Sequence, residues 1–249
     1  MVIANMNQKG GTGKTATTVN IGGILANSGK RVLLVDADPQ GSMSVCLNVD
    51  TGGMSDVIME GEPMTNIITN VRERLDLAPT SIQLAGVDLG LLDAYNREYR
   101  LRDALAPVKA NYDYILIDSP PSLAMMTVNC LAACDQVLIA MSCDFQALMS
   151  VQLLYQSILT MKQRYNQSLG IMGLIRTRYD GRTSHAKAVS DKAAELYSDY
   201  FPVFETIVRE RTAIKDAAAA RQLIIEYQPN GDAAQEYKAL TKEIFGNGA

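Results

Sequence analysis

The chain reads Lys9-Gly10-Gly11-Thr12-Gly13-Lys14-Thr15 shortly after the apolar segment Val2-Ile3-Ala4. In phosphate-binding loops, glycines let backbone N–H groups wrap the phosphates, the closing Lys meets the β/γ oxygens, and the closing Ser or Thr coordinates Mg²⁺. Standard spacing would require a glycine at position 8, where the chain has Gln8. This order of residues, between an apolar strand and a helix-forming run, favours a deviant phosphate-binding loop with the additional Lys9 over a plain turn.

A helix is predicted directly after the loop, over about residues 15–27. Its apolar residues are Val19, Ile21, Ile24 and Leu25, and the pattern ends at Ser28-Gly29. The amino terminus of this helix would point at the phosphates, adding partial positive charge and unpaired N–H donors. Loop and helix together therefore predict an anion site.

The composition predicts one globular domain over residues 1–249. The chain has 249 residues, of which 47% are apolar, so it can bury a full core. It begins with no basic segment, and no run approaches about 18 uninterrupted apolar residues. We expect a cytoplasmic location, no membrane partner and no helix-turn-helix domain before the first strand.

The cysteines do not suggest a metal centre. Cys46, Cys130, Cys134 and Cys143 lack C-x-x-C spacing, and the only histidine is His185. A zinc site would have too few ligands of the usual kind. Buried, reduced thiols are the expected state.

Short β-rich apolar runs alternate with helical patterns almost to the end of the chain. The expected strands cover residues 2–4, 31–35, 75–78, 114–117, 136–141, 170–176 and, more weakly, 223–226. Further helices are expected near residues 96–109, 123–133, 145–165, 184–199, 212–220 and 232–245, and residues 48–70 are interpreted as connections with a short helix. This alternation predicts an α/β fold with a doubly wound, mostly parallel sheet and helices on both faces. Its ligands would bind at the carboxyl ends of the strands.

Acidic residues follow two of the predicted strands. After residues 31–35 come Asp36-Ala37-Asp38-Pro39-Gln40-Gly41-Ser42. Residues i and i+2 of an extended segment share a face, so both carboxylates are expected near Mg²⁺ and the attacking water. The apolar run over residues 114–117 ends in Asp118, a Walker B arrangement in which the acid holds Mg²⁺ through a water. An acid at the end of a strand is often only a helix cap. Together with the phosphate-binding loop, however, both acidic motifs are expected at the same edge of the sheet.

The motifs KGGTGKT, DADPQGS and LIDSPPS, with Tyr179-Asp180-Gly181-Arg182-Thr183 further on, resemble those of the ParA/MinD ATPases, in particular the short ParA/Soj-like branch. The resemblance covers nearly the whole chain. It implies a deviant Walker A P-loop fold, an ATP-dependent homodimer and nonspecific DNA binding by that dimer. It also implies weak ATPase activity, stimulated by a ParB-type centromere-binding partner.

The resemblance assigns roles by position. Nucleotide would be bound by Lys9, Gly10, Gly11, Thr12, Gly13, Lys14, Thr15 and Ala16. Lys14 would be the general P-loop lysine, and Lys9 the signature lysine that reaches across the dimer. Thr15 would coordinate Mg²⁺, with Asp36 and Asp118 supporting the metal shell, and Asp38 would orient the hydrolytic water.

Several positions depart from the family pattern. Relatives usually have Thr or Ser at position 16, where Ala16 lacks a hydroxyl that would touch the α-phosphate. Near the adenine, MinD-like relatives have Asn where alignment places Thr177 and Pro where it places Val208. The residues that recognise the base therefore stay open.

Basic residues concentrate late in the chain. Residues 1–161 carry 10 Lys and Arg against 16 Asp and Glu, whereas residues 162–221 carry 11 against 7. Although the whole chain has a net charge of −4, a local basic face can still bind DNA phosphates. The candidate contacts, each also readable as an ordinary surface charge, are Arg176, Arg178, Arg182, Lys187, Arg209, Arg211, Lys215 and Arg221.

Three other kinds of protein share the deviant loop. A MinD-like membrane ATPase would end in a basic amphipathic helix, but here the stripe Ala233, Tyr237, Leu240 and Ile244 has balanced charges around it and suits core packing better. A dethiobiotin-synthetase-like enzyme would need further polar groups for its substrate. A reductase like the nitrogenase iron protein would need cysteines that share a cluster between subunits. Cys130 lies near a plausible place, but no second matching cysteine is evident.

Overall fold

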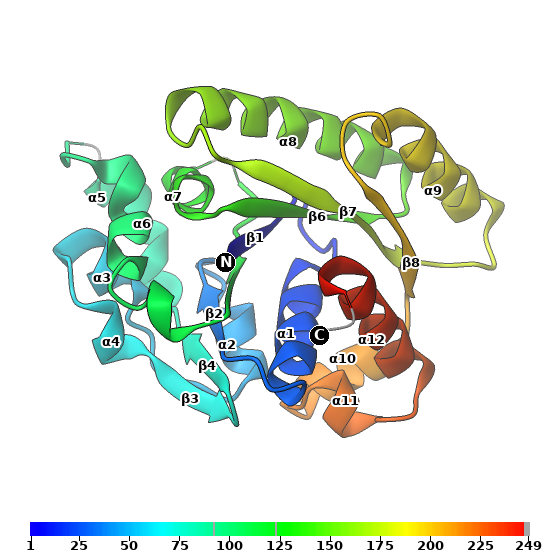
Figure 1. Cartoon of the computed structure of the whole chain (residues 1–249), viewed down its shortest axis with the longest axis horizontal. Coiled ribbons are helices and arrows are strands. Elements are labelled where there is room, and N and C mark those ends of the chain that lie inside the picture. Colours follow the sequence, from blue (N-terminus) through cyan, green and yellow to red (C-terminus); the bar gives the residue numbers. More distant parts are fainter. Residues whose placement is uncertain (92, 123, 247–249) are drawn as a thin grey trace.

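Apolar runs of the sequence form a mostly parallel sheet, as predicted. Within residues 1–91, 93–122 and 124–246, which the computed structural model describes, eight strands lie in the order β3-β4-β2-β5-β1-β6-β7-β8 (Figure 1). Neighbouring strands are parallel, except that β3 is antiparallel to β4. The strands are β1 (Val2–Met6), β2 (Val32–Asp36), β3 (Thr69–Arg72), β4 (Leu75–Ala78), β5 (Tyr114–Asp118), β6 (Gln136–Ser142), β7 (Gly170–Tyr179) and β8 (Val203–Arg209).

Helices connect the strands and cover both faces of the sheet (Figure 1). The α-helices are α1 (Lys14–Asn27), α2 (Ser42–Cys46), α3 (Met54–Glu60), α4 (Met64–Ile67), α5 (Val87–Gly90), α6 (Arg100–Leu105), α7 (Met125–Ala133), α8 (Phe145–Arg164), α9 (Ser184–Tyr197), α10 (Thr212–Ala219), α11 (Ile224–Tyr227) and α12 (Asp232–Phe245). Short 3₁₀ turns span Ile82–Gly86, Arg97–Tyr99 and Lys109–Asn111.

Alternate side chains of the central strands enter two separate hydrophobic cores. Ile3 and Leu34 face the core that α1, α2, α10, α11 and α12 cover. Ala4 and Leu33 face the opposite core, which α3 and α5 to α9 cover. Because both faces are buried, the strands carry continuous apolar runs rather than an alternating pattern.

The carboxyl ends of β1, β2 and β5 meet at one edge of the sheet. In the strand register, Asp118 lies between Asp36 of β2 and Asn5 of β1. The strand order turns around at β1, whose two neighbours, β5 and β6, come much later in the chain. Doubly wound sheets bind their ligands at such a point, so this edge positions the site.

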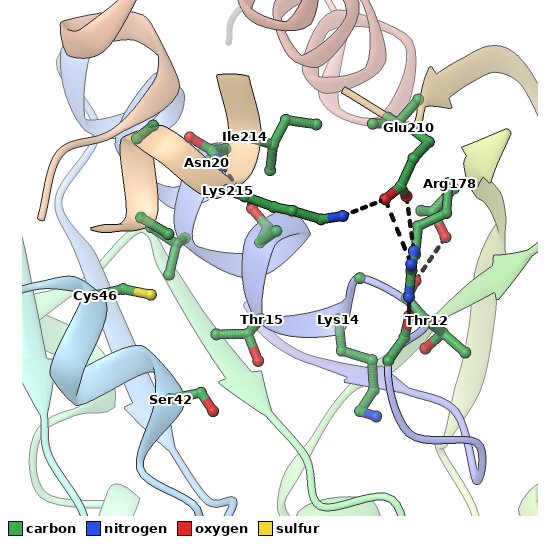
Figure 2. A pocket seen from close by; sticks show the side chains of 18 of the residues that line it. Thr12, Lys14, Thr15, Asn20, Ser42, Cys46, Arg178, Glu210, Ile214 and Lys215 are labelled. Atoms are coloured by element: carbon green, nitrogen blue, oxygen red, sulfur yellow. Dashed lines mark hydrogen bonds and ion pairs between the residues drawn. The ribbon is translucent and has the colours of Figure 1, made fainter. Parts of the chain in front are cut away.

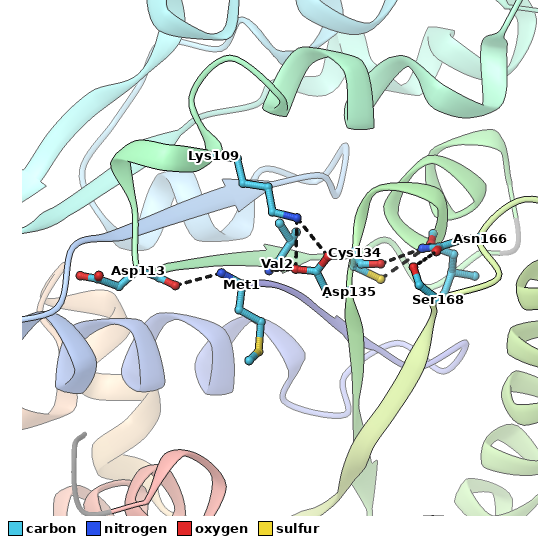
Figure 3. A network of polar contacts seen from close by, with 9 residues as sticks. Met1, Val2, Lys109, Asp113, Cys134, Asp135, Asn166 and Ser168 are labelled. Atoms are coloured by element: carbon cyan, nitrogen blue, oxygen red, sulfur yellow. Dashed lines mark hydrogen bonds and ion pairs between the residues drawn. The ribbon is translucent and has the colours of Figure 1, made fainter.

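The opposite edge of the sheet is tied together by polar contacts (Figure 3). The Oδ2 atom of Asp135 accepts the N–H of Val2 at 2.7 Å, and its carboxylate pairs with Lys109 at 3.0 Å. The amino group of Met1 donates to the Asp113 carbonyl at 3.0 Å. These contacts join the starts of β1, β5 and β6.

The strand predicted over residues 223–226 is wrong, because α11 covers Ile224–Tyr227. The N–H of Leu223 donates to Glu226 Oε2, and the N–H of Ile224 donates to Asn20 Oδ1 on α1. These bonds fix a helical turn against α1. The last strand is instead β8, which the sequence pattern misses because Phe204 and Val208 are its only buried residues.

Smaller differences occur in the connections. Residues 48–70 contain two short helices, α3 and α4, rather than one, and they also contain the start of β3. The helix predicted over residues 96–109 is reduced to α6 and two 3₁₀ turns, since Pro107 has no N–H for a further helical bond. The helix predicted over residues 123–133 is observed from Met125, and residue 123 lies outside the described residues.

Candidate nucleotide-binding site

The loop between β1 and α1 takes the conformation that its glycines predict. Gly11 and Gly13 have φ values of 72° and 82°, in the left-handed region that favours glycine. Asn7 anchors the start of the loop: its Oδ1 accepts the N–H of Lys9 at 2.9 Å, and its Nδ2 donates to the Ala140 carbonyl at 2.7 Å. Since α1 starts without a side-chain cap, its first N–H groups are available to an anion.

A cavity of about 490 Å³ opens onto this loop (Figure 2). Asp38 lines it from the segment after β2, and Thr177 and Val208 line it from the ends of β7 and β8. The loop contributes Gly10, Gly11, Thr12, Gly13, Lys14, Thr15 and Ala16. The structure thus brings together all the predicted nucleotide-binding residues except Lys9. Thr177 and Val208, the two positions predicted to lie near adenine, line the same cavity.

Two buried carboxylates and a hydroxyl lie beside the loop. Asp36 and Asp118 are both 0% exposed. Asp118 Oδ2 accepts the Thr15 hydroxyl at 2.5 Å, and Asp36 Oδ2 accepts the N–H and hydroxyl of Ser44 at 2.9 and 2.7 Å. The Oδ1 atoms of both carboxylates have no hydrogen-bond partner, and a buried acceptor of this kind is unfavourable unless a ligand satisfies it.

These unsatisfied oxygens fit Mg²⁺, which binds oxygen and is commonly held by one or two carboxylates together with phosphate oxygens and waters. In the described part of the chain, no three His, Cys, Asp or Glu residues gather in a way that would hold a metal by themselves. The predicted metal residues Thr15, Asp36 and Asp118 do meet, so they fit a magnesium site that nucleotide phosphates complete.

The electrostatics of the pair favour a cation. Burial raises the pKa of Asp118 to about 8, and the neighbouring Asp36 carboxylate adds to that rise. Burial also raises the pKa of Asp36 to about 6, although the hydrogen bonds from Ser44 act to lower it. A bound cation would favour the charged form of both groups.

We expect the nucleotide-free protein to lose stability as the pH rises. Both folded-state pKa values, about 6 and about 8, exceed the ordinary 3.8, so the folded protein binds these protons more tightly than the unfolded chain does. Their effect is nil below about pH 4, grows through pH 6 and is complete above pH 8. Asp118→Asn should flatten this fall and raise the free energy of unfolding at pH 8 by roughly 2 kcal/mol.

Urea unfolding of both proteins without nucleotide, at about pH 5 and about pH 8, measures this effect. Asp113→Asn is a matched control, because it makes the same change in an acid at the other edge of the sheet (Figure 3). An equal loss of stability in Asp118→Asn and the wild type would contradict the expectation.

Lys14 and Asp38 face the same part of the cavity. Lys14 is only 6% exposed. Burial lowers its pKa, although Asp118 and Asp38 act in the opposite direction. One carboxylate oxygen of Asp38 accepts the N–H of Gln40 at 3.0 Å. The arrangement places a cation and a separate carboxylate at the wall of one cavity.

Lys9 is held outside the cavity by an acid that sequence reasoning missed. Its Nζ atom lies 2.6 Å from Asp144 Oδ1, and Asp144 Oδ2 accepts the Ser142 hydroxyl at 2.7 Å. Burial raises the pKa of Asp144, but the hydrogen bonds from Lys9 and Ser142 outweigh it and leave that pKa below the ordinary value. Asp144 comes two residues after the apolar strand β6, and Asp118 is the last residue of β5, so a similar signal was present in the sequence.

Four of the candidate DNA contacts are engaged at the corner between β8 and α10. Arg209 and Arg211 both pair with Glu236 of α12, at 2.7 and 2.8 Å. Arg178 and Lys215 both pair with Glu210, each at 2.7 Å (Figure 2). All four cations therefore already have an acidic partner.

The other candidates differ in availability. Arg176 donates to the Ser190 hydroxyl and to the carbonyls of Phe204 and Glu205, so its guanidinium is used inside the protein. Arg182 pairs with Asp180, but its side chain is 90% exposed. Lys187 and Arg221 are exposed. Arg182, Lys187 and Arg221 are thus the most available of the predicted contacts.

The prediction of buried thiols is confirmed for three cysteines and wrong for one. Cys130, Cys134 and Cys143 are buried, whereas Cys46 is partly exposed and lines the cavity. Burial raises the pKa of Cys134 to about 12 and that of Cys130 well above its ordinary value.

A glycine-rich loop between the first strand and first helix, beside carboxylates at the ends of neighbouring strands, defines a P-loop nucleotide-binding protein. Comparison with known proteins agrees. Residues 1–171 match the model of an AAA domain family, and residues 123–249 match that of 4Fe-4S iron sulfur cluster binding proteins of the NifH/frxC family.

The relatives narrow this class. The chain is 38% identical to the sporulation initiation inhibitor protein Soj of Bacillus subtilis, over 99% of both chains. It is 36% identical to the chromosome partitioning protein ParA of Myxococcus xanthus, over 98% of this chain and 87% of that one. The chain belongs to the ParA/Soj/MinD family of P-loop ATPases.

A solved structure shares both the fold and substantial sequence. Cobyrinic acid a,c-diamide synthase of Mycobacterium smegmatis, with bound ADP and magnesium, is 31% identical and has a TM-score of 0.83. The alignment covers 97% of this chain and 92% of that one. That neighbour therefore binds a nucleotide and magnesium on a sheet of the same architecture.

Two observations concern the helices: their length and apolar character, and the packing of the α12 stripe. Across the described helices, none combines the length and apolar character that a membrane span requires. Core packing of the α12 stripe is confirmed, since Ala233, Tyr237 and Leu240 are at most 2% exposed and Ile244 packs partly buried beside them.

Proposed function

We propose that this chain is a DNA-partition ATPase. ATP and Mg²⁺ bind in the cavity, two ATP-bound copies form a homodimer, and the dimer holds DNA without sequence preference. Hydrolysis, stimulated by a ParB-type partner, then releases the DNA. The observation that carries the proposal is the deviant loop, which lies beside the Asp36–Asp118 pair. Lys14 of this loop lies inside the cavity, and Lys9 lies outside it. The name of the relative from Myxococcus xanthus, chromosome partitioning protein ParA, supports the partition role.

The chain's own residues account for nucleotide binding. The N–H groups of the loop and of the start of α1 bind phosphate oxygens, and the buried Lys14 ammonium neutralises their charge. The Thr15 hydroxyl oxygen and the Oδ1 atoms of Asp36 and Asp118, which have no hydrogen-bond partner, would hold Mg²⁺. Bound Mg²⁺ supplies charge stabilisation at the phosphates.

Hydrolysis needs little beyond positioning and charge. Asp38 lines the cavity and uses Oδ1 to accept the Gln40 N–H, so its second oxygen is the acceptor for the attacking water. As the water oxygen bonds to the γ-phosphorus, the bond to the β–γ bridging oxygen breaks, giving ADP and phosphate, and the proton that the water loses passes to solvent. Asp38 orients the water, and Lys14 balances the charge on the oxygens.

Phosphate release from ATP and Mg²⁺ by the purified chain, without any small-molecule co-substrate, tests the proposal. Slow turnover that DNA and a ParB-type partner accelerate is the expected result. A requirement for a carboxylate substrate would instead favour a ligase like the diamide synthase. ATP-dependent sedimentation with liposomes would favour a MinD-like protein in place of the proposed cytoplasmic, nucleoid-associated one.

The DNA interface should depend on Arg182 and Lys187, at the carboxyl end of β7 and the start of α9. We expect the double change Arg182→Ala and Lys187→Ala to weaken ATP-dependent DNA binding about tenfold and to lower the slope of log affinity against log salt by about 2. Fluorescence anisotropy with a duplex of arbitrary sequence, at several salt concentrations, measures both quantities.

Lys192→Ala is the matched control, because Lys192 lies on the same helix and pairs with Glu195 at 2.7 Å. It is matched to Lys187→Ala measured alone, because each change removes one positive charge from α9, and in Lys192→Ala that charge is already paired with an acid. DNA binding that survives the double change, or that is lost equally in the control, would place the interface elsewhere.

A further inference from the structure

The end of β7 contacts the phosphate-binding loop through two successive side chains. The Thr177 hydroxyl donates to the Thr12 carbonyl at 2.6 Å, and Arg178 Nη1 donates to the Gly11 carbonyl at 2.5 Å. Thr177 is 1% exposed, so the first of these bonds is buried. Two consecutive carbonyls of the loop are thus held against β7.

Holding these carbonyls also fixes the direction of two N–H groups. In a trans peptide unit the carbonyl and the following N–H point in opposite directions. The bond to the Gly11 carbonyl therefore turns the N–H of Thr12 away from β7, and the bond to the Thr12 carbonyl does the same for the N–H of Gly13. Both residues line the cavity, and preorganised N–H groups of this kind bind phosphate without a cost of reorganisation.

The backbone of Arg178 is itself constrained. Its φ is 50°, in the left-handed region that is uncommon for a residue with a side chain. Such strain persists where surrounding contacts hold it, and it often marks a functional position. Here the contacts are the bond to Gly11 and the ion pair with Glu210.

Glu210 commits the Arg178 side chain to this position. Its Oε2 atom lies 2.7 Å from Arg178 Nε, and its Oε1 atom lies 2.7 Å from Lys215 Nζ on α10 (Figure 2). Hydrogen bonds from Arg178 lower the pKa of Glu210, with Lys215 adding to the effect. One carboxylate therefore links the loop, the end of β7 and the start of α10.

We propose that Arg178 is a positioning residue for the phosphate-binding loop and not a DNA contact. It acts through the Gly11 carbonyl, and Glu210 holds it in place. The proposal deepens the nucleotide-binding function proposed above and rests on it. It also predicts that two cations of the basic segment, Arg178 and Lys215, serve the nucleotide pocket.

Arg178→Met tests the proposal, because methionine keeps an unbranched side chain and removes every donor. We expect the Kd for ADP with Mg²⁺ to rise about tenfold. Amide hydrogen exchange at Thr12 and Gly13 should accelerate in the nucleotide-free protein, while exchange in the strands stays unchanged. Glu210→Gln should give a smaller change of the same kind, because the bond to Gly11 remains.

Binding of duplex DNA at saturating ATP separates the two roles of the arginine. Arg178→Met should then bind DNA as the wild type does, whereas Arg182→Ala should lose DNA affinity with unchanged exchange at Thr12 and Gly13. Unchanged exchange and ADP affinity in Arg178→Met would overturn the proposal, as would a loss of DNA binding at saturating ATP. If the wild type does not bind ADP or ATP, the proposed function fails, while the exchange data still report on the contact itself.

Discussion

Lys9→Ala should retain nucleotide binding and lose hydrolysis, whereas Lys14→Ala should lose both. Lys14 is buried inside the cavity, so its removal leaves phosphate charge without a cation, and we expect ATP affinity to fall by a hundredfold or more. Lys9 lies outside the cavity and forms an ion pair with Asp144. Its proposed contribution comes from across a dimer, like an arginine finger supplied in trans, and we expect its loss to slow hydrolysis about a thousandfold.

Equilibrium titration with a fluorescent ATP analogue and a phosphate-release assay separate the two lysines. Lys30→Ala, in the turn after α1, is a control for the loss of one positive charge. Equal loss of ATP affinity in Lys9→Ala and Lys14→Ala would contradict the separate roles. Normal hydrolysis by Lys9→Ala would exclude a function for the additional lysine of the loop.

Asp38→Ala should trap the ATP-bound dimer. Asp38 is the proposed acceptor for the attacking water, and it is not among the groups that hold phosphate or metal, so its removal should slow hydrolysis about a hundredfold or more while ATP still binds. Size-exclusion chromatography with ATP and Mg²⁺ should show a dimer that persists in Asp38→Ala and decays to monomer in the wild type as ATP is consumed.

Asp56→Ala is the matched control for this experiment, since Asp56 is an exposed acid on α3. It should behave as the wild type does. Adding DNA should increase the retained dimer if DNA and ATP bind the same state. A monomer under all conditions, in every variant, would count against the dimer mechanism as a whole.

Features that depend on local sequence could be predicted well. Gly11 and Gly13 permit the left-handed backbone angles of the loop, and continuous apolar runs are typical of strands buried on both faces. These two facts place Lys14, Asp36 and Asp118 at one edge before any coordinates are known, because parallel strands end together. The residues predicted to hold magnesium come together in the structure for the same reason.

Features that depend on distant partners could not be predicted. No pattern near Glu210 indicates that it would join Arg178 and Lys215, which come from a strand and a helix on either side of it. Isolated cations in a basic segment look alike in a sequence, although the structure divides them into paired and available ones. β8 was missed because its exposed charged positions interrupt the apolar signal.

The polar contacts at the starts of β1, β5 and β6 have a practical consequence for single-molecule work. β1 has five residues, so this edge lies about 17 Å from the phosphate-binding loop along the sheet. A surface tether or dye attached beside Lys109 or Asp113 would leave the cavity and α9 facing the solution. Immobilised in that orientation, the protein should report nucleotide and DNA exchange without interference from its own attachment.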